Sequence, residues 1–331
     1  MKKPVLELRD LKVIYKTDMD TVHAVNSVNL CLGAGSTLGV VGETGAGKTT
    51  VALSIMRLLP ERTGKIVGGE ISFFGQDLIK FSDADMRLIR GERIAMIFQD
   101  PMTSLNPVFT VGEQIAEAIR LHNASKRTES EIENRVDEVL SLVGISSNRK
   151  TEYPHQFSGG MRQRVVIAIA LACEPDLLIA DEPTTALDVT IQAQVLMMIR
   201  ELRDRLNMSM MLITHDLGIV AQTCDNVAVM YAGEMVEVGT AVDIFKGNTH
   251  HPYIIGLFGS IPSFHNRSKR LTPIPGLMPD LVDLPSGCCF APRCPNRMSQ
   301  CDAVHPNIYV CGTQKISCHL FADKKEWAKE E

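Results

Sequence analysis

The sequence predicts an α/β fold whose core is a buried parallel sheet that carries a phosphate-binding loop. Three observations support this prediction. An apolar run at residues 38–41 enters a glycine-rich loop and a helix, a second run at 177–180 ends in two carboxylates, and strand and helix patterns alternate from residue 159 onward. Strands of a parallel sheet are covered on both faces, so their sequences read as unbroken apolar runs. We expect an antiparallel β subdomain, a helical subdomain and a small, irregular, metal-binding C-terminal extension around this core.

The glycine-rich loop carries the first chemical signal. Residues 38–50 read LGVVGETGAGKTT, which is the strand–GxxxxGK[ST]–helix order of a phosphate loop. Glycines allow successive backbone N–H groups to turn toward a phosphate at the positive end of a helix. Lys48 can reach the β- and γ-phosphates, and Thr49 offers a hydroxyl to Mg²⁺. We therefore expect a nucleoside triphosphate to bind at this loop.

Length and composition restrict the function classes. The chain has 331 residues, enough for two domains, and its net charge of −5 gives no general attraction for nucleic acid. Its start has no apolar run long enough for a secretion signal, and no stretch approaches the ~18 uncharged apolar residues of a membrane span. We expect a protein of the cytoplasm that is soluble or peripheral to a membrane.

The remaining elements follow from periodicity and turn residues. Residues 4–35 alternate apolar and polar positions, as antiparallel strands do, and Tyr15 within them can stack on a base or simply pack on the sheet. Amphipathic helices near 111–122 and 129–143 interrupt the β–α alternation, so we expect a helical subdomain at about 100–173. The other expected strands are 68–75, 94–98, 177–181, 209–214, 226–231 and 234–238, and the other expected helices are 160–173, 190–206 and 216–222.

Two carboxylates and a histidine follow predicted strands. Asp181 and Glu182 end the apolar run that begins at Leu177, and His215 follows the run that ends at Thr214. Ligands of parallel sheets bind at the carboxyl ends of the strands, so these side chains are expected beside the phosphate loop. There Asp181 can hold Mg²⁺, and Glu182 can orient and deprotonate the attacking water. The alternatives are a helix N-terminal pair for the two acids and a plain strand-end residue for His215.

A second glycine pair stands at the start of a predicted helix. Ser158 is a good N-cap, but Gly159 and Gly160 directly after it are unfavourable in a helix unless the backbone approaches something closely. A second phosphate-binding helix start explains them. Because the helical subdomain separates this turn from the phosphate loop of the same chain, we expect the nucleotide to be shared between two chains.

Together these segments resemble the ABC ATPase family, a group of P-loop NTPases, over residues 4–245. The residues that carry the resemblance are 42–50, 99, 158–164, 181–182, 186–188 and 214–216. The resemblance implies a head-to-tail dimer in which two ATP molecules lie between the phosphate loop of one subunit and residues 158–160 of the other. It also implies that Gln99 senses the γ-phosphate and Mg²⁺, that His215 holds the γ-phosphate and the attacking water, and that Asp188 lies in the subunit contact.

The chain departs from the usual family signature at two positions, where Phe157 and Met161 replace Leu and Gln, but the serine and both glycines are intact. We therefore expect a site that is competent for hydrolysis. The expected catalytic residues are Glu182, His215 and Gln99. The residues expected around Mg²⁺ are Thr49, Gln99 and Asp181. The residues expected to bind ATP are Tyr15, Gly42, Glu43, Thr44, Gly45, Ala46, Gly47, Lys48, Thr49, Thr50, Ser158, Gly159, Gly160 and Met161.

Cysteines crowd the end of the chain beyond residue 245, where prolines concentrate and regular periodicity fades. This change predicts two domains, 1–245 and 246–331. Four cysteines have the spacing Cys288-x5-Cys294-x6-Cys301-x16-Cys318. Tight C-x2-C pairs, typical of structural zinc, are absent from this sequence, and four thiolates on an irregular loop suit an iron–sulfur cluster better. Zinc and no metal at all stay open as alternatives.

The tail makes the resemblance narrower. Segments 251–253, 261–262, 274–276 and 287–295 resemble the C-terminal extension of the oligopeptide/dipeptide importer ATPases, as does the run 98–107. That resemblance implies a [4Fe–4S] cluster. Its expected ligands are Cys288, Cys294, Cys301 and Cys318, with Cys289 as the other candidate for the first position.

The same resemblance implies the ATP-hydrolysing motor subunit of a membrane importer for di- and oligopeptides, peripheral on the cytoplasmic face of the cell membrane. Its partners would be a second ATPase subunit, identical or paralogous, two transmembrane permease subunits and an extracytoplasmic substrate-binding protein. A motor for nickel or another small solute is the first alternative, because the motor does not touch the transported solute. A soluble ABC ATPase of translation or DNA repair is the second, although that class usually has two fused nucleotide domains or a long coiled-coil insertion.

Overall fold

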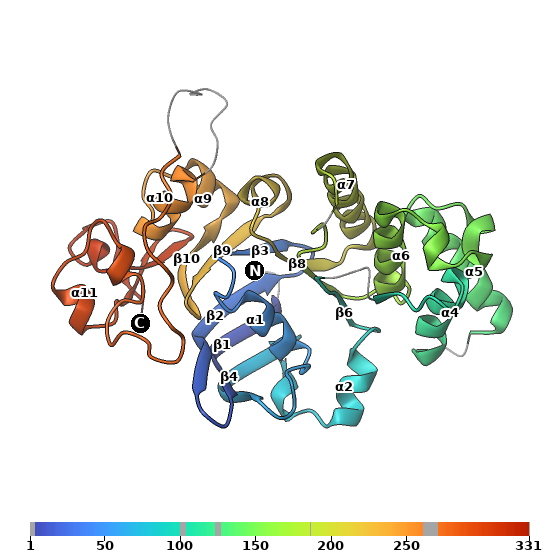
Figure 1. The fold of residues 1–331 in the computed structure, drawn as a ribbon, viewed down its shortest axis with the longest axis horizontal. Helices are drawn as coiled ribbons and strands as arrows, with labels where there is room; N and C mark the ends of the chain where they lie inside the picture. The colour runs from blue at the N-terminus through green and yellow to red at the C-terminus, as the bar shows by residue number, and fades with distance from the viewer. Residues whose placement is uncertain (1–3, 100–103, 123–126, 186, 261–270, 331) are drawn as a thin grey trace.

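The structure is a computed structural model that describes residues 4–99, 104–122, 127–185, 187–260 and 271–330. Two sheets organise these residues, one of four strands and one of nine. Figure 1 shows the helical subdomain at one end of the molecule and the C-terminal extension at the other, with the four-stranded sheet and the central strands of the larger sheet between them. Among the helices of the described residues, none has both the length and the apolar character needed to span a bilayer.

The four-stranded sheet is antiparallel. Its strands are β1 (Pro4–Lys16), β2 (Thr21–Gly33), β4 (Gly64–Phe73) and β5 (Gln76–Asp77). They lie in the order β2-β1-β4-β5. Leu6 pairs with Leu32 on one side and Phe73 on the other, and all three are buried, so one face of the sheet joins a core. The antiparallel strands expected in residues 4–35 are confirmed, whereas the strand expected at 68–75 begins earlier.

The nine-stranded sheet is mixed and forms the centre of the molecule. Its strands are β3 (Thr37–Val41), β6 (Ile94–Ile97), β7 (Leu177–Asp181), β8 (Ser209–Ile213), β9 (Asn226–Tyr231), β10 (Glu234–Thr240), β11 (Ile308–Cys311), β12 (Gln314–Ser317) and β13 (Ala328–Lys329). The order is β13-β11-β12-β10-β9-β3-β8-β7-β6. The five strands from β9 to β6 are parallel, and the other four add an antiparallel edge. Every residue of β3, β7 and β8 is buried, which explains why these strands are apolar apart from one polar residue at an end of each.

Helices surround the nine-stranded sheet. The α-helices are α1 (Lys48–Ile55), α2 (Asp83–Ile89), α4 (Val111–Leu121), α5 (Glu129–Leu142), α6 (Gly159–Leu171), α7 (Val189–Leu206), α8 (Leu217–Thr223), α9 (Ala241–Lys246), α10 (Pro252–Gly259) and α11 (Gln300–Ala303). The 3₁₀ helices are η1 (Leu78–Lys80), η2 (Ser147–Thr151), η3 (Pro154–Gln156), η4 (Ala291–Arg293) and η5 (His319–Phe321). Thr110 and Thr128 form capping boxes that begin α4 and α5. The helices predicted near 111–122, 129–143, 160–173, 190–206 and 216–222 are confirmed to within two residues at each end. The sequence pattern does not predict α2, α9, α10 and α11.

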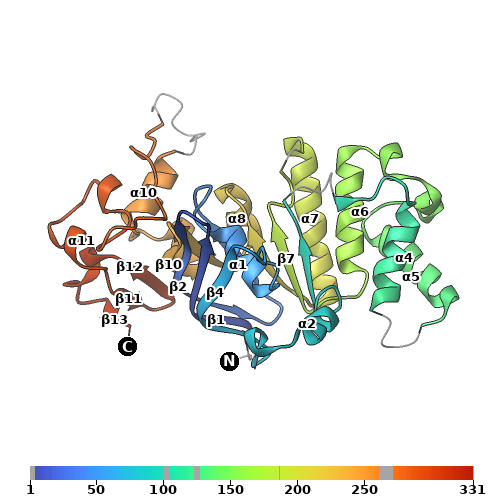
Figure 2. The same cartoon turned by 60° about the horizontal axis from the view of Figure 1, so that its bottom comes forward.

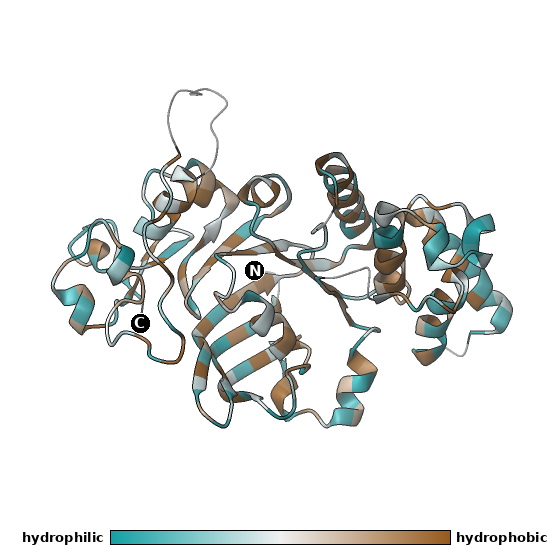
Figure 3. Cartoon of the chain, viewed as in Figure 1, coloured by the Kyte–Doolittle hydropathy of each residue, from teal (hydrophilic) through white to brown (hydrophobic). Residues whose placement is uncertain are grey.

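One large hydrophobic core joins the parallel sheet to the helical subdomain. Ile115 of α4, Val139 of α5 and Ile167 of α6 belong to it, together with Leu178 of β7. Figure 3 shows apolar residues along the central strands and α6, while polar residues predominate on α5 and α11 at the two ends. The helical subdomain is therefore anchored to the sheet mainly through α6.

The C-terminal extension is more regular than the sequence predicts. Residues 308–317 form a hairpin whose second strand pairs with β10, through Glu237 and Ile316 among others. Figure 2 shows β11, β12 and β13 side by side beyond β10. Tyr253 and Phe290 belong to the large core that holds the parallel sheet. The prediction of an irregular extension is wrong for this hairpin, because a short edge strand is stabilised by a distant partner that the local pattern does not reveal.

Candidate functional site

The phosphate loop connects β3 to α1. Gly47 is the N-cap of α1 and has a left-handed backbone, with φ of 105°. A Cβ atom there would lie 2.4 Å from the carbonyl oxygen of Ala24, and one at Gly42 would lie 2.1 Å from that of Met230. Both glycines are therefore required by the close approach of neighbouring strands as well as by the loop conformation.

Lys48 fills the centre of this loop. Its Nζ donates to the carbonyl oxygens of Gly42 (2.8 Å) and Glu43 (2.9 Å), and the residue is 7% exposed. Burial lowers the pKa of Lys48, and the nearby carboxylates of Glu182 and Asp181 oppose that shift. An ammonium group in this position can move from carbonyl oxygens to phosphate oxygens without entering bulk water.

Asp181 ends β7 next to the phosphate loop. It is 1% exposed, burial raises its pKa, and the Thr49 hydroxyl donates to it. Its Oδ1 atom is buried without a hydrogen-bond partner. Since a buried carboxylate oxygen is costly unless it is paired, this atom fits a Mg²⁺ ion or a Mg²⁺-bound water beside Thr49.

Glu182 follows Asp181 in a left-handed backbone conformation, with φ of 46°. Its carboxylate lies 3.1 Å from His215 Nδ1, and it accepts hydrogen bonds from Gln99 (3.1 Å) and Thr185 (2.9 Å). Burial alone would raise the pKa of Glu182, but the bonds from His215 and Thr185 outweigh it, and the pKa lies below its usual range. The structure therefore places His215 and Gln99 around the ionised carboxylate of Glu182.

A hollow of about 390 Å³ opens over these groups. It is lined by Tyr15, Val22, Ala24, Thr44, Gly45, Gly47, Lys48, Thr49, Thr50, Gln99, Glu182, His215 and Leu281. Tyr15 and Thr50 have their hydroxyl oxygens 3.3 Å apart, so the ring of β1 stands beside the start of α1. Of the phosphate-loop residues expected to bind ATP, Gly42, Glu43 and Ala46 do not line it; Gly42 and Ala46 are buried.

The second glycine pair lies elsewhere. Ser158 caps α6 by accepting from the Met161 N–H (3.4 Å), and neither these two residues nor Gly159 and Gly160 line the hollow. A Cβ atom on Gly160 would lie 2.7 Å from the side chain of Ile191, so α7 also requires this glycine. Ser158 and Gly159 are exposed. Within one chain, the serine–glycine turn and the phosphate loop do not form a common site.

Two parts of the predicted pattern are only partly described. Asp188 is the N-cap of α7, but it accepts no capping hydrogen bond through its side chain, and the preceding Ala186 lies outside the described residues. Residues 100–103, which belong to the run 98–107, also lie outside them.

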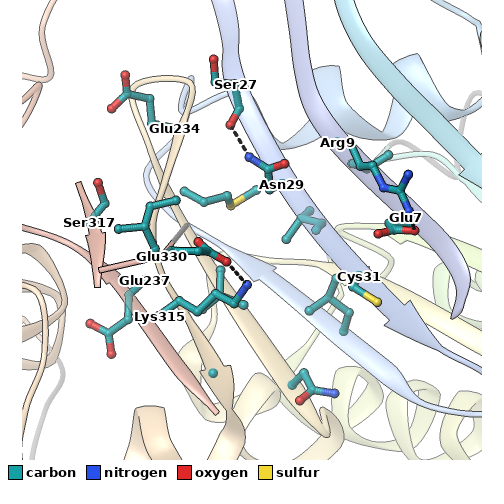
Figure 4. A pocket seen from close by; sticks show the side chains of 18 of the residues that line it. Glu7, Arg9, Ser27, Asn29, Cys31, Glu234, Glu237, Lys315, Ser317 and Glu330 are labelled. Carbon is teal, nitrogen blue, oxygen red and sulfur yellow. Dashed lines mark hydrogen bonds and ion pairs between the residues drawn. The ribbon is translucent and has the colours of Figure 1, made fainter. Parts of the chain in front are cut away.

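A larger hollow of about 960 Å³ lies between β2, β10 and β12. Figure 4 shows carboxylates, Lys315 and the thiol of Cys31 around it. Among its lining residues, Glu7, Glu234, Glu237 and Glu330 outnumber the cations Arg9 and Lys315. The excess of carboxylates and the absence of a glycine-rich loop from its lining make this hollow unsuitable for a triphosphate.

Several residues that contact the phosphate loop were not singled out from the sequence. The Tyr253 hydroxyl accepts from the Glu43 N–H (2.9 Å), and Arg293 forms an ion pair with the Glu43 carboxylate (2.8 Å). Leu281 lines the hollow above the phosphate loop, and Thr185 donates to Glu182. Tyr253 and Arg293 lie in segments that resemble the importer extension, and this resemblance is the one sequence feature that draws attention to them. Nothing in the neighbouring residues predicts their contact with the phosphate loop.

The four cysteines of the predicted metal site are neighbours. Burial, together with the nearby thiols of Cys288, Cys294 and Cys301, raises the pKa of Cys318 to about 12. Backbone N–H groups donate to three of these sulfurs, those of Cys288, Cys294 and Cys318, and favour their thiolate forms. Cys289 differs, because its thiol hydrogen-bonds to Glu234. However, no group of three or more His, Cys, Asp or Glu side chains in the described residues is arranged to hold a metal ion, so the predicted metal site is not supported.

Comparisons with known proteins agree with the geometry. Residues 25–185 match the family described as "ABC transporter", and residues 236–301 match "Oligopeptide/dipeptide transporter, C-terminal region". The dipeptide transport ATP-binding protein DppD of Bacillus subtilis is 51% identical over 98% of this chain and 97% of its own length. The chain belongs to the ABC transporter ATP-binding family. The oligopeptide transport ATP-binding protein OppD of Haemophilus influenzae is 47% identical over 97% of this chain and 98% of its own.

Solved structures of ABC ATPases have the same fold. The dimeric ATP-binding cassette MJ0796, in a post-hydrolysis state with ADP and Pi, has a TM-score of 0.64 at 25% identity, and covers 71% of this chain and 98% of its own. The cbiO1 protein of Clostridium perfringens, part of the cbiONQ transporter complex, has a TM-score of 0.65 at 30% identity and covers 74% and 92%. As an ABC ATPase, this chain is an ATP-hydrolysing transporter subunit.

Proposed function

We propose that this chain is the motor subunit of an ABC importer for di- and oligopeptides, and that it couples ATP binding and hydrolysis to movement of a membrane permease. The observation that carries the catalytic part is the carboxyl edge of the sheet. There the ionised Glu182 and the buried Lys48 line one hollow, and the unpaired oxygen of Asp181 belongs to a carboxylate that accepts from Thr49, another lining residue. The names of the relatives, which are dipeptide and oligopeptide transport ATP-binding proteins, support the peptide part.

Each group in the hollow has a task in hydrolysis. Lys48 can exchange its carbonyl partners for β- and γ-phosphate oxygens. Asp181 and Thr49 would hold Mg²⁺, which would offset the charge of the phosphates. Glu182 orients the attacking water and accepts its proton, since its carboxylate is ionised at neutral pH. His215 and Gln99 hold that carboxylate through hydrogen bonds. We expect both side chains to contact the γ-phosphate when ATP is bound.

The site is completed by a second subunit. Ser158 and Gly159 are exposed at the start of α6 and do not line the hollow of their own chain, which supports a head-to-tail dimer with two shared ATP molecules. A cysteine pair, Thr44→Cys and Ser158→Cys, should crosslink two subunits when ATP is present. Full ATPase activity of strictly monomeric protein would contradict this arrangement.

The remaining partners follow from transport. We infer two transmembrane permease subunits, an extracytoplasmic substrate-binding protein and a position on the cytoplasmic face of the membrane. The test is purification of the complex from solubilised membranes and measurement of its ATPase activity with the binding protein and peptides. Stimulation by peptides is the expected result. Stimulation by nickel alone, or recovery of ribosomes or DNA in place of a permease, would refute the peptide assignment.

Residues 246–331 are proposed to form the second domain, after the nucleotide-binding domain at 1–245, with a [4Fe–4S] cluster on its cysteines. The proposed ligands are Cys288, Cys294, Cys301 and Cys318. Their mutual proximity and the N–H groups that donate to three of them support this assignment, and the partnership of Cys289 with Glu234 favours Cys288 as the first ligand. Such a cluster would crosslink separate loops of the extension and can also carry one electron.

Iron content tests the cluster proposal. Anaerobically purified protein should be brown and contain about four iron atoms per chain. Cys318→Ser should lose the iron, while Cys311→Ser, the matched control in the same region, should keep it. Colourless wild-type protein without iron would refute the cluster.

A further inference from the structure

Glu43 connects the phosphate loop to the C-terminal extension through its N–H group and its carboxylate. Its carbonyl oxygen accepts from Lys48 Nζ, and its N–H donates to the Tyr253 hydroxyl. Its two carboxylate oxygens bind the two terminal nitrogens of Arg293, at 2.8 and 3.2 Å. A single residue of the loop is therefore held by Lys48 on one side and by two residues of the extension on the other.

Arg293 is itself rigidly held. Its side chain is 6% exposed, its Nε donates to the Pro275 carbonyl oxygen (2.9 Å), and Nη1 also donates to the Tyr231 hydroxyl (3.3 Å). The rings of Tyr231, Tyr253 and Phe290 pack on one another around it. Arg293 is buried and Glu43 is partly exposed. A bidentate guanidinium–carboxylate pair of this kind fixes geometry better than a fully exposed ion pair, and removal of Glu43 would leave the buried guanidinium without its carboxylate.

The extension also reaches the nucleotide hollow directly. Leu281 lines the hollow together with Tyr15 and Val22, and its carbonyl oxygen accepts from the His23 N–H of β2 (2.8 Å). The methyl group of Met278 lies close to Gly45 of the phosphate loop. Apolar side chains in such a hollow suit a flat, largely apolar base, while the loop suits the phosphates.

We propose that the C-terminal extension completes the ATP site: Arg293 is a positioning residue that holds the phosphate loop through Glu43, and Leu281 contacts the adenine base. This inference rests on the proposed function, because it assigns ATP to the hollow. Arg293 acts before ATP arrives, by keeping the Glu43 carbonyl against Lys48 and the loop in its open, phosphate-ready form. Preorganisation of this kind raises affinity and leaves the chemical step at Glu182 unchanged.

The first measurement is ATP affinity of the full chain by calorimetry, together with the steady-state KM and kcat. Arg293→Met and Glu43→Gln should each raise the Kd and KM for ATP about tenfold, with kcat within about twofold of wild type. The double variant should be no weaker than either single one, because both remove the same contact. Arg297→Met is the matched control, since Arg297 pairs with Asp302 in the same extension and away from the loop, and it should bind ATP normally.

Inorganic pyrophosphate separates the two contacts. Leu281→Ala should weaken ATP but leave pyrophosphate affinity unchanged, whereas Arg293→Met should weaken both. Leu277→Ala is the control for Leu281, because Leu277 is 91% exposed in the same segment. A merely structural role would lower kcat through a smaller folded fraction and leave KM unchanged, and that result would overturn the positioning role. If Arg293→Met does not fold, Glu43→Gln tests the positioning role through the same Kd and KM for ATP, and Leu281→Ala still tests the base contact.

Lys48→Ala distinguishes failure of this inference from failure of the proposed function. If Lys48→Ala binds ATP as wild type does, the hollow is not the ATP site and the proposed function fails. If Lys48→Ala loses ATP while Arg293→Met and Glu43→Gln bind it with wild-type affinity, the positioning role alone is wrong. Unchanged ATP affinity in Leu281→Ala refutes the base contact.

Discussion

The carboxyl edge of the parallel sheet and the C-terminal extension meet at the same loop, but they are built in opposite ways. At the edge, polar groups are left strained or unpaired: Glu182 has a left-handed backbone, and Asp181 Oδ1 has no partner. In the extension, Arg293 donates hydrogen bonds to Pro275, Glu43 and Tyr231. The buried His251 ring accepts a hydrogen bond from the Tyr253 N–H. The reacting groups thus keep capacity for ligands, whereas the supporting groups are satisfied within the protein.

The largest effect is expected at the edge. Glu182→Gln removes the group that accepts the proton of the attacking water, so ATP hydrolysis should fall by about 10²–10⁴-fold while ATP binding is retained. Phosphate release and ATP binding, measured on the same preparation, check this. Glu201→Gln on the exposed face of α7 is the control and should hydrolyse ATP normally. Unchanged hydrolysis in Glu182→Gln would show that Glu182 does not accept the proton of the attacking water.

Gly47→Ala tests how tightly the loop is set against its neighbours. The new Cβ would meet the Ala24 carbonyl oxygen at 2.4 Å in a left-handed backbone, and we expect unfolding free energy to fall by about 3 kcal/mol or more. Gly75→Ala is the control, because Gly75 also has a positive φ but nothing lies within 4 Å of its Cβ position. It should cost about 1 kcal/mol. Equal losses in urea unfolding would show that the close approach is unimportant.

Two adjacent histidines predict how the extension responds to acid. Burial lowers the pKa of His251 to about 3 in the folded protein, whereas its pKa in the unfolded chain is near 6.5. Between these two pH values only the unfolded state binds the proton, so the free energy of unfolding falls as the pH falls. At pH 5 the loss should be about 2 kcal/mol relative to neutral pH, and His251→Asn should abolish it. Urea unfolding at several pH values measures this.

The pKa of His250 is shifted in the opposite direction from that of His251, so His250 serves as the matched control. Its hydrogen bond with the buried Glu237 raises its pKa, so its contribution is fully present below about pH 6.5 and is lost as pH rises through the raised value. His250→Asn should therefore steepen the acid loss that His251→Asn removes. The same pH profile in both variants would contradict these assignments.

The smallest effect is expected from Tyr253→Phe, which keeps the packed ring but removes the acceptor of the Glu43 N–H. Loss of one such hydrogen bond should lower the unfolding free energy by about 1 kcal/mol, without the effect of losing the ring. Tyr309→Phe, in the small cluster of the extension, is the comparison variant. A loss above ~3 kcal/mol in Tyr253→Phe would mean that the contact between extension and loop depends on this hydroxyl rather than on Arg293.

Much of the fold and of the hollow could be predicted because the signals are local. The strand β7 is apolar from Leu177 to Ala180 and ends at the buried Asp181. The rule that ligands bind at the carboxyl ends of parallel strands then brings Asp181, Glu182 and Lys48 together. The loop conformation that the phosphate-loop glycines permit, and the threonine caps of α4 and α5, depend on residues only a few positions away. Local conformation and backbone hydrogen bonding depend on neighbouring residues, so the sequence itself determined these features.

Only the tertiary structure decided how the end of the chain returns to its beginning. Glu43 and Arg293 are 250 residues apart, and no periodicity relates them. Three other features depend in the same way on the path of the whole chain. They are the pairing of β12 with β10, the place of Leu281 in the hollow, and the hydrogen bond that Cys289 forms with Glu234 and Cys288 does not. A contact between distant segments forms only after each is placed by its own core, and that placement is a property of packing rather than of any short stretch of sequence.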